Sequence, residues 1–151
     1  MGNELNLTEL RGRVSGPVFI SGDEGIAEEV ACFNQAIHHS PELVIGAASA
    51  DDVAEAVRFA AANGLEVSVQ ATGHTESAIT SGLLLTTRRM DGFAVDPEEK
   101  TVTAGAGVKW QPVIAAAAEY SLAPIAGSSP MVSMVGYLTG GGLGPLVRSH
   151  G

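Results

Sequence analysis

Apolar positions in residues 42–72 follow two different periods, and together they predict a strand, a helix and a second strand. The short apolar runs at 42–48 and 65–72, "ELVIGAA" and "LEVSVQAT", are typical of strands. Between them, Ser49 and Gly64 are placed to cap the two ends of a helix. The expected buried stripe of that helix consists of Val53, Ala56, Val57 and Ala60. Since a strand, a helix and a strand within about 30 residues form a βαβ unit, we expect the two strands to be parallel.

The first 40 residues carry weaker patterns. Residues 1–20 are expected to form an arm that contains a short edge strand. Residues 21–37 predict a helix, because acidic residues stand at its start and apolar residues recur at helical spacing. We therefore divide the chain into an N-terminal arm and helix, residues 1–40, and a main domain, residues 41–151.

Apolar stretches after residue 80 indicate antiparallel structure. The run "GLLLTT" at 82–87 and the segments on either side of the turn at 96–99 predict a meander, in which that turn closes a hairpin. Residues 108–122 predict another helix that tolerates Pro112 in its first turn, with Trp110 as a core anchor. The expected fold is α+β, with a parallel βαβ subdomain followed by an antiparallel subdomain.

Charge and cysteine content exclude several classes of function. The net charge is −9 with only 8 Lys plus Arg, which argues against a nucleic-acid-binding surface. The single cysteine, Cys32, excludes a disulfide within the chain and is expected to be a small buried residue. No apolar leader opens the chain, and prolines and glycines interrupt the uncharged stretch 120–147. We therefore expect a cytoplasmic protein without a membrane span.

Most remaining polar side chains predict a solvated surface. No histidine pair has metal-ligand spacing on a predicted helix, so we expect no metal site. The side chains expected to face solvent are Asp51, Asp52 and Glu55 on the predicted helix and the histidines His38, His39 and His150.

Two glycine-rich loops, residues 71–78 and 127–144, are the candidate binding segments. Neither is a dinucleotide fingerprint, because other residues stand where the third glycine belongs in "GAGVKW" and "GGGLGP". Backbone N–H groups of such loops bind phosphate without lysine, which suits an acidic chain. Hydroxyl groups add further donors at Thr72, Thr75, Ser77, Ser128 and Ser129. Each loop taken singly is also compatible with a simple tight turn.

The segment "ELVIGAASADDVAEAVRFAAANGLEVSVQATGHT" resembles the opening of the FAD-binding domain in the vanillyl-alcohol oxidase superfamily. It is most similar to the berberine-bridge-enzyme-like group of FAD-linked oxidases. The resemblance extends back over "RGRVSGPVFISGDEGIAEEVACFNQAI" and forward through "GLLLTTRRMDGFAVDPEEKTVTAGAG" to "GSSPMVSMVGYLTGGGLG". It implies a PCMH-type FAD-binding domain over residues 41–151.

The resemblance also implies which residues hold FAD. In this family a histidine in the loop after the second parallel strand bonds covalently to the flavin 8α-methyl group, and His74 occupies that position. Ser129 stands where many members carry a second, cysteinyl link, so any covalent linkage runs through His74 alone. In the first loop the implied cofactor-binding residues are Ala71, Thr72, Gly73, His74, Thr75, Glu76 and Ser77. In the second they are Gly127, Ser128, Ser129, Val132, Gly136, Tyr137, Gly140, Gly141 and Gly142.

The implied function is the FAD-binding portion of an FAD-dependent oxidoreductase that passes hydride from a small organic substrate to flavin. Family members are several hundred residues long, so we expect an incomplete domain, without the substrate domain and inactive alone. Two alternatives stay open. One is a non-catalytic remnant or scaffold, and the other is an NADPH-dependent reductase of the same superfamily that binds FAD non-covalently. The substrate, the catalytic residue and the oligomeric state are left open.

Overall fold

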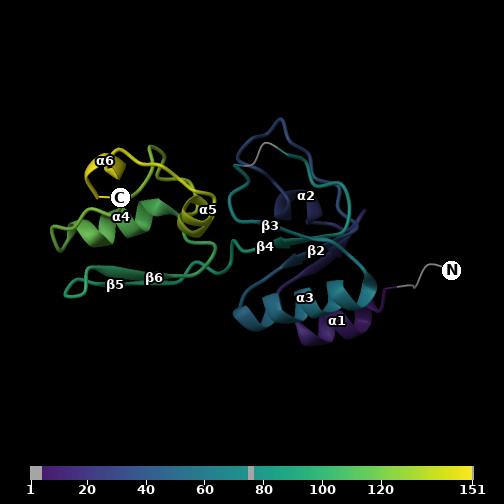
Figure 1. Cartoon of the computed structure of the whole chain (residues 1–151). Coiled ribbons are helices and arrows are strands. Elements are labelled where there is room, and N and C mark those ends of the chain that lie inside the picture. Colours follow the sequence, from purple (N-terminus) through teal and green to yellow (C-terminus); the bar gives the residue numbers. More distant parts are fainter. Residues whose placement is uncertain (1–4, 75–76, 151) are drawn as a thin grey trace. The chain divides into compact units, whose positions relative to one another are not determined.

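The computed structural model describes residues 5–74 and 77–150 (Figure 1). The chain forms two compact units, residues 1–89 and residues 90–151, and each is treated by itself. The predicted division at residue 40 stays a prediction, although strands from both sides of that position pair within the first unit.

In the described part of the first unit, four strands form one mixed sheet. They are β1 (Val18–Ile20), β2 (Leu43–Gly46), β3 (Val67–Gln70) and β4 (Leu83–Thr86), in the spatial order β1-β2-β4-β3. β1 is antiparallel to β2 at the edge, as expected, while β2 and β3 are each parallel to β4. The predicted parallel direction of β2 and β3 is therefore confirmed.

The expectation that residues 82–87 belong to an antiparallel meander is wrong. β4 lies between β2 and β3 and pairs with both in parallel. Leu83, Leu84 and Leu85 are all buried, so both faces of this strand are covered. A continuous apolar run is typical of a central strand in a parallel sheet, which the expected meander did not take into account.

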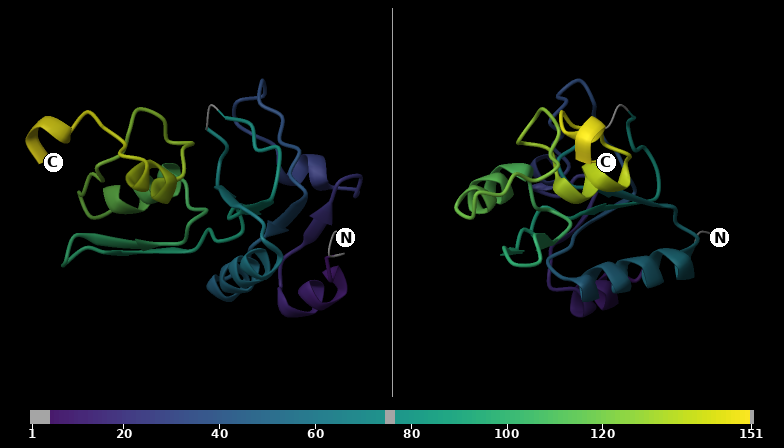
Figure 2. Two further views of the ribbon diagram at one scale, coloured as in Figure 1. Left: turned by 45° about the vertical axis from the view of Figure 1, so that its right-hand side comes forward. Right: turned by 60° about the vertical axis from the view of Figure 1, so that its left-hand side comes forward.

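Helix α3 (Ala50–Asn63) connects β2 to β3 and packs beside α1 (Leu7–Arg13), as Figure 2 shows. The predicted caps are confirmed: the Ser49 hydroxyl accepts a hydrogen bond from the Asp52 N–H over 3.2 Å, and Gly64 ends the helix at φ +69°. Ala56 and Ala60 are buried as expected. Val57, however, is 46% exposed, because it lies off the contact face.

The expectation that the Asp52 side chain faces solvent is wrong. The residue is 1% exposed, and its carboxylate accepts hydrogen bonds from the N–H groups of Ser15 (2.8 Å), Gly16 (3.1 Å) and Ala48 (2.8 Å). Burial alone raises the pKa of this carboxyl, but the backbone donors outweigh burial and hold the pKa below its ordinary value. The carboxylate therefore ties the residues before β1 and those between β2 and α3 to the start of α3.

The long helix predicted over residues 21–37 is wrong. Only Ile26–Glu29 is helical (α2), and left-handed Gly25, at φ +86°, precedes it. Beyond Val30 the backbone turns to tertiary partners, because the N–H groups of Phe33 and Asn34 donate to the carbonyls of residues 72 and 73. These long-range hydrogen bonds replace those that a continuing helix would make.

The second unit contains the predicted hairpin, β5 (Phe93–Asp96) paired antiparallel with β6 (Thr101–Ala104). The Asp96 side chain accepts from the N–H groups of Glu98 and Glu99 in the turn. Helix α4 (Trp110–Ala118) packs on β5, followed by the short helices α5 (Met134–Thr139) and α6 (Val147–His150). Trp110 is buried with Val108 and Val113, which confirms it as a core anchor. Among the described residues, no helix is long and apolar enough to cross a membrane.

Candidate functional site

The first candidate loop begins where β3 ends, at Gln70. Gly73 adopts the left-handed conformation at φ +67°, and a Cβ added there would lie 2.6 Å from the Cα of Cys32. The segment around Phe33 can therefore pass directly against the loop, and the Phe33 N–H donates to the Thr72 carbonyl over 3.0 Å. The loop and the 32–34 segment form one hydrogen-bonded layer.

His74 is held in this layer by contacts with Thr72 and Phe33. The hydroxyl of Thr72 lies 2.9 Å from Nδ1 of His74. The Phe33 ring stacks on the imidazole with the ring centroids 4.0 Å apart and the planes at 11°. The half-buried imidazole is therefore restricted both in its plane and in its rotation within that plane.

Behind the loop, Cys32 and His39 make a contact that the sequence did not reveal. The Ile79 N–H donates to Nδ1 of His39 over 2.9 Å, so in the neutral ring Nε2 carries the proton. Nε2 lies 3.0 Å from the sulfur of Cys32. His39 is thus a half-buried structural residue, and the expectation of a solvated side chain is wrong for it. Burial raises the pKa of the half-buried Cys32 thiol.

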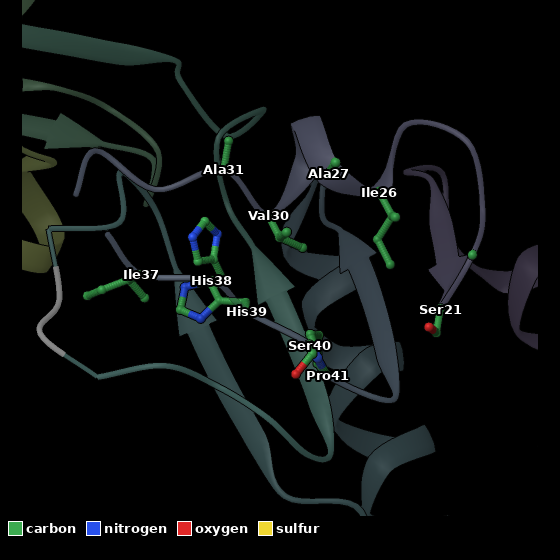
Figure 3. A pocket seen from close by; sticks show the side chains of 11 residues that line it. Ser21, Ile26, Ala27, Val30, Ala31, Ile37, His38, His39, Ser40 and Pro41 are labelled. Carbon is green, nitrogen blue, oxygen red and sulfur yellow. The ribbon is translucent and has the colours of Figure 1, made fainter. Parts of the chain in front are cut away.

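A small pocket of about 290 Å³ opens beside this cluster (Figure 3). Its walls are α2 with the residues after it and the stretch 37–41. Apolar side chains such as Ile26, Val30 and Ile37 line it together with both neighbouring histidines. Within the described residues there is no group of three or more His, Cys, Asp or Glu side chains placed to hold a metal ion.

The second candidate loop is partly helical. Ser133 caps α5, and the chain then turns through three glycines. The N–H groups of Gly140, Gly141 and Gly142 donate to the carbonyls of Gly136, Leu138 and Tyr137. Amides free to bind phosphate were expected along this whole loop, but the N–H groups of these three glycines complete the end of the helix.

Residues 127–129 have the backbone N–H groups that were expected to be available to an anion. Within the described part of the chain, the N–H groups of Gly127, Ser128 and Ser129 make no hydrogen bond. Three successive N–H donors in an irregular segment suit an anion such as a diphosphate. This stretch, more than the later glycines, offers the amide donors of the second loop.

Tyr137 explains two of the glycines. A Cβ added at Gly127 would lie 2.8 Å from its ring, and one added at Gly142 would overlap the ring. The ring also meets Trp110 edge-on, with the centroids 5.6 Å apart. The buried Tyr137 hydroxyl has no hydrogen-bond partner among the described residues. The Tyr137 ring is therefore closely packed, while its hydroxyl makes no hydrogen bond to the described residues.

Of the predicted cofactor-binding residues, Thr75 and Glu76 lie outside the described residues, and Ser77 is exposed. Ala71 to His74 belong to the first unit, and the set from Gly127 to Gly142 belongs to the second. That the two loops meet around one cofactor stays a prediction. Sequence reasoning missed Phe33 and His39 as neighbours of the first loop. The family resemblance extends over residues 11–37, which gave a signal for Phe33 but none for His39.

The FAD binding domain family matches residues 41–151. The chain belongs to this family. The predicted relationship to FAD-linked oxidoreductases and the predicted α+β fold are confirmed. (R)-6-hydroxynicotine oxidase of Paenarthrobacter nicotinovorans is 30% identical over 141 residues, covering 91% of this chain and 31% of that protein. An uncharacterized FAD-linked oxidoreductase of Bacillus subtilis is 27% identical, covering 97% and 33%.

Solved structures agree. The crystal structure of 6-hydroxy-D-nicotine oxidase from Arthrobacter nicotinovorans has a TM-score of 0.83 and 30% identity, covering 91% of this chain and 31% of that one. A BBE-like protein of Physcomitrella patens has a TM-score of 0.79 at 20% identity, covering 95% and 32%, and shows the fold alone. The chain spans about a third of the length of these relatives.

The described residues fit FAD, the cofactor of this family. The free N–H groups of residues 127–129 suit its diphosphate, and the Tyr137 hydroxyl is a buried polar atom without a partner in the described chain. His74 presents an imidazole at the end of a parallel strand, where ligands of α/β sheets commonly bind.

Proposed function

We propose that this chain is the FAD-binding portion of an oxidoreductase that removes hydride from a C–H bond of a small organic substrate, with FAD bound covalently through His74. When bound, FAD accepts the two electrons of that hydride and passes them to an acceptor such as dioxygen. The chain supplies binding and orientation. The single observation that carries the proposal is the restrained His74 imidazole, held by Thr72 and Phe33 at the end of β3.

The chemistry of the link fits the residues. Attachment joins an imidazole nitrogen of His74 to the carbon of the 8α-methyl group. The N–H hydrogen and one methyl hydrogen leave as protons, and the two electrons released reduce dioxygen to hydrogen peroxide. Ser129 cannot supply a second link of this kind, because its hydroxyl is far less acidic than a thiol. A single bond through His74 is expected.

The test is retention of flavin under denaturing conditions. The chain is incubated with FAD in air, freed of excess cofactor and precipitated with acid, and flavin absorbance and fluorescence are measured in the pellet. Flavin stays with the wild-type chain and is released from His74→Ala. His38→Ala is the matched control, because His38 is an exposed histidine outside residues 71–78, and it retains flavin.

The outcomes separate the alternatives. A chain that takes up no FAD at all contradicts the proposal and favours a non-catalytic remnant. If the wild type binds FAD but its acid pellet contains no flavin, and His74→Ala takes up the same amount of FAD, the result favours a reductase that binds the cofactor non-covalently.

A further inference from the structure

Phe33 is an exposed aromatic side chain in an unusual position. Its side chain is 62% exposed, so it adds little to the apolar core of the first unit. Yet its backbone is tied to the candidate loop, since its N–H donates to the Thr72 carbonyl over 3.0 Å and the Asn34 N–H donates to the Gly73 carbonyl over 3.3 Å. The position of residue 33 is therefore set by main-chain contacts that any side chain would allow.

The ring of Phe33 stacks on the imidazole of His74. The planes lie within 11° of parallel at a centroid distance of 4.0 Å, which is face-to-face stacking. Thr72 contacts the same imidazole at Nδ1 over 2.9 Å, in the plane of the ring. The phenyl face sets the plane of the imidazole and the hydroxyl sets its rotation, so together they select one orientation.

Orientation matters for bond formation at this ring. An imidazole nitrogen attacks along its lone pair, which lies in the ring plane, so tilting the ring moves the lone pair off the target carbon. Misplacement by about 1 Å can slow a reaction roughly a hundredfold. The Phe33 ring restricts this tilt.

We propose that Phe33 is a positioning residue that sets the plane of the His74 imidazole for its attachment to flavin. The proposal rests on the covalent attachment proposed above. It assigns Phe33 no contact with substrate and no part in hydride transfer.

The experiment compares Phe33→Ala and Phe33→Trp with the wild type, using Val69→Ala as a control. Val69 is 63% exposed, on β3, so it matches Phe33 in exposure and lies in the same unit. The first readout needs no flavin: proton NMR of the carbon-bound ring protons of His74, assigned by their loss in His74→Ala. Stacking over a phenyl face shields these protons, so they move downfield in Phe33→Ala and stay shielded in Phe33→Trp and Val69→Ala.

The second readout is the rate at which acid-stable flavin accumulates after FAD is added. We expect it to be roughly ten- to a hundredfold slower in Phe33→Ala, with the initial non-covalent uptake of FAD unchanged. Phe33→Trp restores the rate, because indole supplies the same flat face. If Phe33 had a purely structural role, Phe33→Ala would instead lower the non-covalent uptake of FAD and the stability of the protein along with the attachment rate.

Two results overturn the proposal. Unchanged His74 signals in Phe33→Ala would show that the stack is absent. An unchanged rate of flavin attachment in Phe33→Ala, with the wild type forming acid-stable flavin, would show that the stack does not position the imidazole. Failure of the proposed function looks different: the wild type itself then forms no acid-stable flavin, whatever residue stands at position 33.

Discussion

The carboxylate of Glu29 accepts two hydrogen bonds from the guanidinium of Arg89, over 2.8 and 2.6 Å. Glu29 is 4% exposed, and the hydroxyl of Thr86 donates to the same carboxylate. This pair joins α2 to the segment that follows β4. Gly46 makes room for it, because a Cβ there would lie 2.8 Å from the Glu29 carboxylate and overlap the guanidinium.

Glu29→Gln is expected to destabilise the first unit by about 2–3 kcal/mol. Removing one partner of a fully buried ion pair costs about 3–5 kcal/mol, and the partial exposure of Arg89 lowers that value. Urea unfolding measures the change. Glu28→Gln, at the exposed neighbouring position, is the control and is expected to stay within about 0.5 kcal/mol of the wild type. Equal effects of the two substitutions would contradict the structural role of the pair.

Asp52→Asn is expected to cost about 2 kcal/mol, because an amide replaces a carboxylate that accepts from three backbone N–H groups. Asp51→Asn tests the same chemical change at the exposed position beside it, where the effect on unfolding free energy is expected to be within about 0.5 kcal/mol. Denaturant midpoints of the two variants give the comparison. A midpoint of Asp52→Asn at the wild-type value would show that these hydrogen bonds add no net stability.

Stability is expected to fall in acid through these two carboxyls. Burial alone raises each pKa, but hydrogen bonds and, for Glu29, the charge of Arg89 outweigh it, so both folded pKa values lie below the ordinary 4.5 and 3.8. A group with a lowered folded pKa stabilises the fold fully above its unfolded pKa and loses that contribution as pH falls through the folded value. The unfolding free energy should be flat from neutral pH to about pH 5 and decline below about pH 4. The double variant Glu29→Gln, Asp52→Asn should show a shallower decline, and an equally steep one would assign the acid sensitivity to other groups.

Gly73→Ala is expected to disrupt the first loop by more than backbone strain alone. Its φ is +67°, and the added methyl would meet the Cα of Cys32 at 2.6 Å. Gly64 has nearly the same φ, +69°, but open space around it, so Gly64→Ala carries only the cost of a left-handed alanine, about 1 kcal/mol. We expect Gly73→Ala to lose about 1–3 kcal/mol beyond that and to weaken the shielding of the His74 ring protons. Equal losses in thermal unfolding would mean that the segment 32–34 moves aside without cost.

Tyr137→Phe separates packing from cofactor contact. The substitution removes a buried hydroxyl that has no partner among the described residues, so the unfolding free energy should be unchanged or up to about 1 kcal/mol higher. If FAD supplies that partner, the dissociation constant of FAD should rise about three- to tenfold. Tyr120→Phe, at an exposed position, should change neither quantity. Unchanged FAD affinity in Tyr137→Phe would leave Tyr137 as a packing residue only.

Short-range features of the sequence, such as helix caps and turn residues, correctly predicted the elements whose ends they mark. Ser49 and Gly64 marked both ends of α3, since caps act within one turn of the chain. The turn after Asp96 predicted the hairpin for the same reason, and the resemblance around His74 predicted the FAD-binding family.

Tertiary structure decided the rest, because it depends on groups far apart in the sequence. β4 became a central parallel strand only by pairing with β2 and β3. The helix expected over residues 21–37 ends early, because the Phe33 N–H donates to the Thr72 carbonyl instead. Asp52 is buried because the N–H groups of Ser15 and Gly16, 37 and 36 residues away, donate to its carboxylate together with that of the nearby Ala48. The sequence by itself determined the family, the capped helix and the loop that carries His74. Only the folded chain decided what surrounds that histidine, since periodicity reports a residue's neighbours along its own segment and carries no information about partners some 40 residues away.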